Sequence, residues 1–119
     1  MPHALSPAQI DALGEFVLER VMVPGSTPRG AVRDLVFTMA KQCPDTRALA
    51  PVLVLAIVAN GLDETLNDSA SPRSSATGLW RMAALVATDV MAMEGQGNGG
   101  RSIADLVAYW HTSDGFFLS

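Results

Sequence analysis

The residues between Arg47 and Asp63 include no charged side chain, and the middle of this stretch is the most apolar part of the chain. This central segment reads Pro51-Val-Leu-Val-Leu-Ala-Ile-Val-Ala59. A helix needs about 20 consecutive apolar residues to cross a bilayer, so the run is too short to span a membrane. We therefore expect it to be buried as the central element of a protein core, and we expect no membrane partner.

The same run has to be either a helix or a strand. Val52, Val54 and Ile57 would suit a strand, but no other segment of the chain offers a partner strand. Asn60-Gly61 is typical of a helix end. We therefore predict a helix that starts near Ala48 or later, so that Pro51 falls in its first turn, and that ends at Asn60-Gly61. Residues 62–67 could add a short further turn.

Start and stop signals predict two helices before this run. Ser6-Pro7-Ala8-Gln9 has the pattern of a capping box, and the helix should continue to about Val23, before Pro24-Gly25. Thr27-Pro28 repeats the start signal for a second helix that reaches about Gln42. Each helix has an inward apolar stripe, made of Ile10, Leu13, Val17 and Val21 in the first and of Val32, Leu35, Val36, Met39 and Cys43 in the second.

The second half of the chain predicts two more helices. Residues 67–77 are small and polar without periodicity, which indicates a mobile loop or hinge. Gly78 to Glu94 is apolar over most of its helical circumference, as in a central helix or one at a subunit contact. Ser102-Ile-Ala-Asp105 opens a last, short amphipathic helix.

Together these segments predict one domain over residues 1–119, an all-α compact bundle of about five helices. Apolar residues make up 49% of the chain and charged residues only 17%. Two helices with so little polar surface are more than a monomer of this length easily covers. We therefore expect a homo-oligomer, most simply a homodimer.

Charge and cysteine content favour some partners and compartments over others. The net charge is −4, and the arginines and lysine between residues 20 and 47 form only a modest positive cluster, so we expect no nucleic-acid partner. The lone Cys43 cannot form an internal disulfide, and residues 1–7 lack the pattern of a secretory signal. A cytoplasmic location is therefore expected.

The segment Gly95-Gln-Gly-Asn-Gly-Gly100-Arg101-Ser102 has the spacing of a phosphate-binding loop, with arginine in place of the lysine. The preceding segment is a predicted helix instead of a strand, and the 19 residues after Gly100 leave no room for the remaining strands of a nucleotide-binding sheet. A flexible glycine linker is the favoured interpretation.

The sequence predicts no metal site, no cofactor and no catalytic residues. Only His3 and His111 could supply imidazole ligands, whereas tight sites need three or four convergent ligands. Cys43 falls on an apolar stripe, where a thiol is usually a small core group. Without a recognisable acid, base and nucleophile, an enzyme is the least favoured class of function.

Four phenylalanines are candidate interaction residues. Phe16 and Phe37 fall outside the apolar stripes of their helices, although for Phe37 a neighbouring loop that covers the ring is the favoured interpretation. Phe116 and Phe117 belong to a tail that we expect to fold back onto the bundle or onto a partner.

Arg81 and Asp89 are, with Thr88, almost the only polar groups of the apolar helix over 78–94. The favoured interpretation is that they mark a narrow solvent edge; the alternative is that they converge with another chain or with a small anionic ligand in a pocket. The candidate ligand-binding residues are Trp80, Arg81, Met82, Asp89, Met91 and Trp110.

Two functions remain open at this stage. The first is a small non-enzymatic protein that acts through protein–protein association in an assembly or regulatory role. The alternative is a small-ligand binding or sensor protein, with a pocket lined by methionine and tryptophan and an arginine that anchors the ligand.

Overall fold

The computed structural model describes residues 5–65, 70–96, 100–113 and 115–118, and within them the chain forms five α-helices, one short 3-10 helix and no strand. This confirms the predicted all-α bundle of about five helices. The elements are α1 (Pro7–Met22), α2 (Pro28–Gln42), α3 (Ala50–Thr65), α4 (Ala70–Glu94), α5 (Ile103–Thr112) and the 3-10 helix η1 (Phe116–Leu118).

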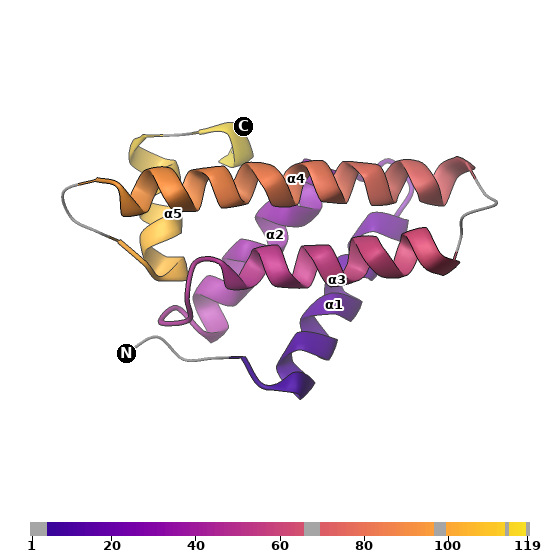
Figure 1. Ribbon diagram of the computed structural model, residues 1–119, viewed down its shortest axis with the longest axis horizontal. Helices are drawn as coiled ribbons and strands as arrows, with labels where there is room; N and C mark the ends of the chain where they lie inside the picture. Colours follow the sequence, from indigo (N-terminus) through magenta and orange to yellow (C-terminus); the bar gives the residue numbers. More distant parts are fainter. Residues whose placement is uncertain (1–4, 66–69, 97–99, 114, 119) are drawn as a thin grey trace.

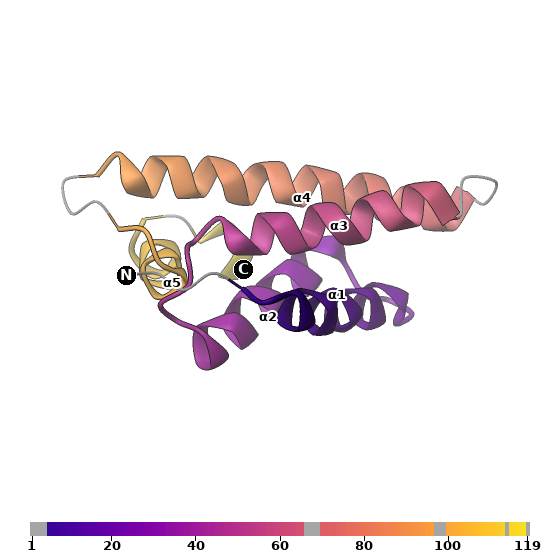
Figure 2. The same cartoon turned by 60° about the horizontal axis from the view of Figure 1, so that its bottom comes forward.

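The helices form two layers. α3 and α4 lie side by side and antiparallel, and they form the most extensive helix pair of the molecule (Figure 1). α1 and α2 pack against one side of this pair, and α5 lies near one end of it (Figure 2). One broad side of the α3–α4 pair therefore has no described helix over it.

Three helices begin at the caps that the sequence predicts. The Ser6 and Ser102 hydroxyls accept from the amides of Gln9 and Asp105, and the two longer side chains accept from the serine amides in return. Thr27 caps α2 in the simpler way, by accepting from the amide of Gly30 at 3.0 Å. At α5, amide donors from Ser102 and Arg101 hold the pKa of Asp105 below its ordinary value.

The segments before α3 and α5 are joined through their backbones. The Ala48 amide donates to the Arg101 carbonyl at 2.8 Å, and the Ile103 amide donates to the Thr46 carbonyl at 2.9 Å. Thr46 is buried here, and its hydroxyl has no hydrogen-bond partner within the described part of the chain. These bonds fix the start of α5 beside the start of α3.

The core lies between the two layers and draws on all five helices. Val17 and Leu35 come from the α1–α2 layer, while Leu55 and Leu79 come from α3 and α4. Trp110 of α5 and Phe117 of η1 close one end, with ring centroids 4.8 Å apart. The tail over 116–118 therefore folds back onto the bundle, as expected.

The predicted helix end at Asn60-Gly61 is wrong, because α3 continues through both residues to Thr65. Among the described residues only Gly25 has a positive φ, so Gly61 does not serve as a left-handed cap. Leu62, one residue further on, is buried. Burial of that side chain offsets the roughly 1 kcal/mol that a glycine costs inside a helix.

The predicted loop over 67–77 is also largely wrong, because α4 already begins at Ala70; residues 66–69 lie outside the described residues. Pro72 falls in the first turn, where a missing amide donor costs little. Ala76 is fully buried, and a Cβ on Gly78 would lie only 2.6 Å from Cγ of Pro28. Small residues are used here because the helix packs closely against its neighbours.

Candidate functional site

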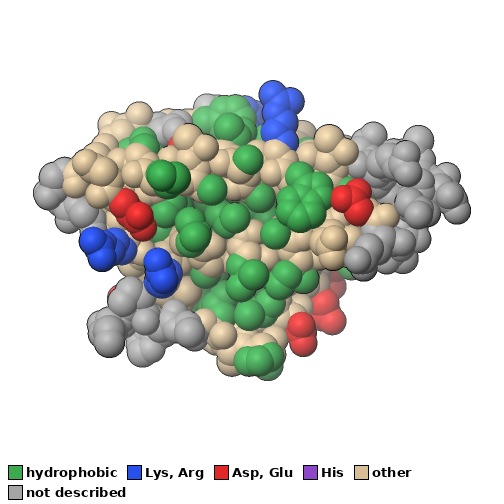
Figure 3. All heavy atoms as spheres, viewed as in Figure 1, with side chains coloured by type: hydrophobic (Ala, Val, Ile, Leu, Met, Phe, Trp, Pro, Cys, Tyr) green, Lys and Arg blue, Asp and Glu red, His purple; other side chains and the backbone are tan. Residues whose placement is uncertain are grey.

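The uncovered side of the α3–α4 pair is an apolar face. Leu53 and Ile57 of α3 are each 48% exposed, and Leu49 projects from the turn before the helix with 46% exposure. Trp80 and Met91 of α4 are also exposed, the latter at 73%. We call these five residues the α3–α4 face. Figure 3 shows hydrophobic side chains gathered over both helices on this side of the molecule.

Spacing explains why these side chains share one side. Leu49, Leu53 and Ile57 follow each other at intervals of four residues, which places them along one line of a helix surface. Trp80, Ala84 and Met91 recur at intervals of four and seven on α4. Because the two helices are antiparallel neighbours, the two lines combine into a single strip.

One hydrogen bond fixes the indole of Trp80 within this strip. Its Nε1 donates to Oδ2 of Asp63, near the end of α3, at 2.8 Å. The polar edge of the ring is therefore satisfied, while 41% of the residue stays exposed. A tryptophan held in this way presents a rigid apolar surface that loses little entropy on binding.

The two ends of the α3–α4 face differ in charge. Arg47 and Arg101 are exposed beside the start of α3, with Glu94 at the nearby end of α4, and Figure 3 shows positive side chains at that end. Asp63 lies at the opposite end, next to Trp80.

The expectation that the whole uncharged run is buried is therefore only half right. Val54, Leu55 and Ala59 are fully buried, whereas Leu53 and Ile57 face outward. A helix formed by this run is apolar around its whole circumference. The spacing of its apolar residues therefore could not distinguish the buried side from the exposed side. The four-residue spacing of Leu49, Leu53 and Ile57 was the available signal, and it becomes informative only when the position of α4 is known.

A second candidate site is a groove of about 760 Å³ between the start of α2, one side of α4 and η1. It brings together three of the six predicted ligand residues, Arg81, Met82 and Asp89. The other three lie elsewhere, since Trp80 and Met91 belong to the α3–α4 face and Trp110 is in the core. Arg29 and Phe116 also line the groove, and the sequence did not indicate them as ligand residues.

Asp89 is a buried carboxylate at the floor of this groove, with 8% exposure. Its Oδ2 accepts a hydrogen bond from Nε1 of Trp110 at 3.0 Å. This bond ties α5 to α4, and it gives Asp89 a structural role that the sequence alone did not indicate.

The four candidate interaction phenylalanines do not form one surface. Phe117 is buried in the core, and Phe116 packs edge-on against it at 5.0 Å. Phe16 is half-buried beneath the guanidinium of Arg20, and Phe37 is half-buried 6.5 Å from the ring of His111. Only Phe116 is largely exposed.

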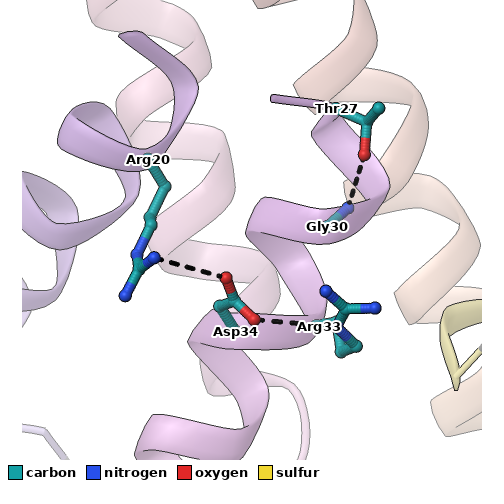
Figure 4. Close-up of polar contacts among 5 residues, drawn as sticks. All are labelled: Arg20, Thr27, Gly30, Arg33 and Asp34. Carbon is teal, nitrogen blue, oxygen red and sulfur yellow. Dashed lines mark hydrogen bonds and ion pairs between the residues drawn. The ribbon is translucent and has the colours of Figure 1, made fainter. Parts of the chain in front are cut away.

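A smaller polar cluster joins α1 to α2 (Figure 4). The carboxylate of Asp34 lies 3.7 Å from a guanidinium nitrogen of Arg20 and 3.6 Å from Nε of Arg33. Such partly exposed ion pairs contribute about 0–1 kcal/mol. Both arginines are engaged by the same carboxylate, so this cluster is a structural contact between two helices.

The described residues offer no group of three or more histidine, cysteine or acidic side chains that could hold a metal ion. None of their helices combines the length and the apolar character that crossing a membrane requires. The segment 97–99 of the predicted glycine linker lies outside the described residues, and Ser102 at its end caps α5. No protein-family model, curated protein or solved structure matches this chain.

Proposed function

We propose that this protein acts through protein–protein association in an assembly or regulatory role, as a cytoplasmic homodimer joined through the α3–α4 face and without a nucleic-acid partner. The observation that carries the proposal is the strip of five exposed large apolar side chains on α3, the turn before it and α4. Contiguous apolar patches of this kind mark interaction sites far more often than single exposed leucines do.

The size of the face supports a second copy as the partner. The 16 residues of α3 span about 24 Å, and two adjacent helices are about 20 Å wide, so the whole side of the helix pair that carries the α3–α4 face measures roughly 500 Å² in projection. Side chains make the accessible area larger than its projection. A second copy that covers this whole side would therefore approach the ~800 Å² per partner of an ordinary stable interface.

Charge complementarity favours an antiparallel arrangement of the two copies. A two-fold axis across the helices would bring the Asp63 end of one copy to the Arg47 and Arg101 end of the other. In this orientation the apolar strips overlap, and Arg47 and Arg101 of one copy lie at the Asp63 rim of the other. Charges at a rim set orientation and association rate more than affinity.

The test is sedimentation equilibrium of the wild type and of the variant Leu53→Glu. We expect a dimer at micromolar concentration for the wild type. Leu53→Glu should weaken self-association at least ~100-fold, because the dimer would bury an unpaired carboxylate.

Val23→Glu is the matched control. Val23 is also an exposed apolar residue, at 54%, but it follows α1 and lies outside the α3–α4 face. This variant should sediment as the wild type does. A wild type that stays monomeric at micromolar concentration would contradict the homodimer.

A further inference from the structure

The groove between α2, α4 and η1 combines positive charge with an apolar surface. Its apolar part is made by Met82 and Leu85 of α4 together with Phe116. Arg29 and Arg81 also line it. Its volume of about 760 Å³ falls within the range of small-molecule sites.

The two arginines keep their hydrogen-bonding capacity for a ligand. Neither forms an ion pair with a carboxylate within the described part of the chain. The guanidinium of Arg29 lies 5.3 Å from the ring centroid of Phe116, a contact with the ring face that leaves its in-plane donors available. Arginine N–H groups that remain available can bind a carboxylate ligand, which can accept two parallel hydrogen bonds.

Asp89 limits the charge that the groove can accept. It is the only acidic side chain among the described lining residues, so the formal charges of the two arginines and the aspartate sum to +1. The buried carboxylate of Asp89 would repel a polyanion such as a nucleotide. A monoanion would neutralise the net positive charge of the groove.

We propose that this groove binds an amphipathic monoanion, a carboxylate with an aliphatic tail. The carboxylate pairs with Arg29 and Arg81 at the groove mouth. The tail lies on Leu85 and Phe116, whose exposed apolar surface it removes from water, and on the small accessible part of Met82. The methionine side chain adapts readily to an aliphatic chain.

This proposal does not rest on the homodimer, because the two surfaces use different side chains of α4. Arg81, Met82 and Leu85 line the groove, whereas Trp80 and Met91 belong to the α3–α4 face; Arg81 and Leu85 adjoin Trp80 and Ala84 on the exposed side of the helix. Ligand binding and self-association can therefore succeed or fail separately.

The experiment is calorimetric titration of the full chain with decanoate, below its micellar concentration. Acetate serves as the carboxylate without a tail, and decanol as the tail without a charge. We expect one decanoate per chain, bound at least about tenfold more tightly than either control compound. Absence of decanoate binding, or equal binding of acetate or decanol, would overturn the proposal.

The double variant Arg29→Gln, Arg81→Gln tests the assigned residues. It should weaken decanoate binding at least about tenfold, since it removes charge-assisted hydrogen bonds, and Arg47→Gln, outside the groove, should not. Leu85→Glu is a second, independent variant: it places a carboxylate four residues from Arg81 and should weaken binding similarly. Unchanged affinity in both groove variants would contradict the site.

Discussion

At the scale of single residues, Thr46 is the least satisfied polar group of the described core. Its side chain is 2% exposed, and its hydroxyl has no partner there, while its carbonyl accepts the amide of Ile103. At this position the backbone hydrogen bond between Ile103 and Thr46 therefore supports the fold, whereas the hydroxyl of Thr46 does not. A buried hydroxyl without a partner carries a desolvation cost of roughly 1–3 kcal/mol.

We predict that Thr46→Val raises the free energy of unfolding by about 1 kcal/mol, since valine has nearly the same shape and no hydroxyl. Urea denaturation followed by circular dichroism would measure the change. Thr46→Ser is the control, because it keeps the hydroxyl and removes the methyl group, and it should lower stability by about 1 kcal/mol. Destabilisation by valine would show that the hydroxyl is hydrogen-bonded, for example to an internal water.

At the scale of the helices, two glycines in helix interiors have opposite surroundings. Gly78 of α4 packs against the ring of Pro28 at the start of α2, where a Cβ would lie 2.6 Å from Cγ. Gly61 of α3 has no atom within 4 Å of the position that a Cβ would occupy. The first glycine sets how closely α2 approaches α4, and the second only weakens its own helix.

We therefore predict opposite effects of the same substitution. Gly78→Ala should lower the free energy of unfolding by at least about 1 kcal/mol, because the overlap with a rigid ring outweighs the gain in helix propensity. Gly61→Ala should raise it by about 0.5–1 kcal/mol. Thermal and urea unfolding of the two variants side by side would measure the difference. Equal shifts in the two would contradict the close α2–α4 contact.

The same pair of helices explains what the sequence could and could not predict. The starts of α1, α2 and α5 were predictable because each depends on a local cap, as at Ser6 and Ser102. The start of α4 at Ala70 and the continuation of α3 past Gly61 were not, because they depend on packing between segments that are distant in sequence.

The candidate sites follow the same rule. Arg81, Met82 and Asp89 were predicted together because they share one helix, and the structure does place them around one groove. Arg29 and Phe116 could not be added to that set, since only the tertiary fold brings them to α4. The exposed side of α3 could not be predicted for a different reason. The helix is apolar on every side, so its sequence does not distinguish exposed from buried positions.

At the scale of the whole molecule, the two candidate surfaces share α4 but do not touch the same side chains. The α3–α4 face uses Trp80 and Met91, and the groove uses Arg81 and Met82. The molecule measures 46 × 29 × 20 Å. Both surfaces use residues of α4 that lie within a few helical turns of each other.

We predict that the two surfaces act independently. The Leu53→Glu variant should bind decanoate with the affinity of the wild type, and the Arg29→Gln, Arg81→Gln variant should keep the sedimentation behaviour of the wild type. Calorimetry and sedimentation on the same preparations would measure both properties. Loss of decanoate binding in Leu53→Glu would reveal a linkage between association and ligand, as in a sensor.

The contact between Arg29 and Phe116 has a consequence for the order of folding. It joins a residue at the start of α2 to one in η1, segments that lie far apart along the chain. Closing so long a loop costs entropy that local helix formation does not, so this contact should form after the α3–α4 hairpin. The groove is then the last surface to be assembled, and amides of η1 should exchange their hydrogens sooner than those of the buried helices.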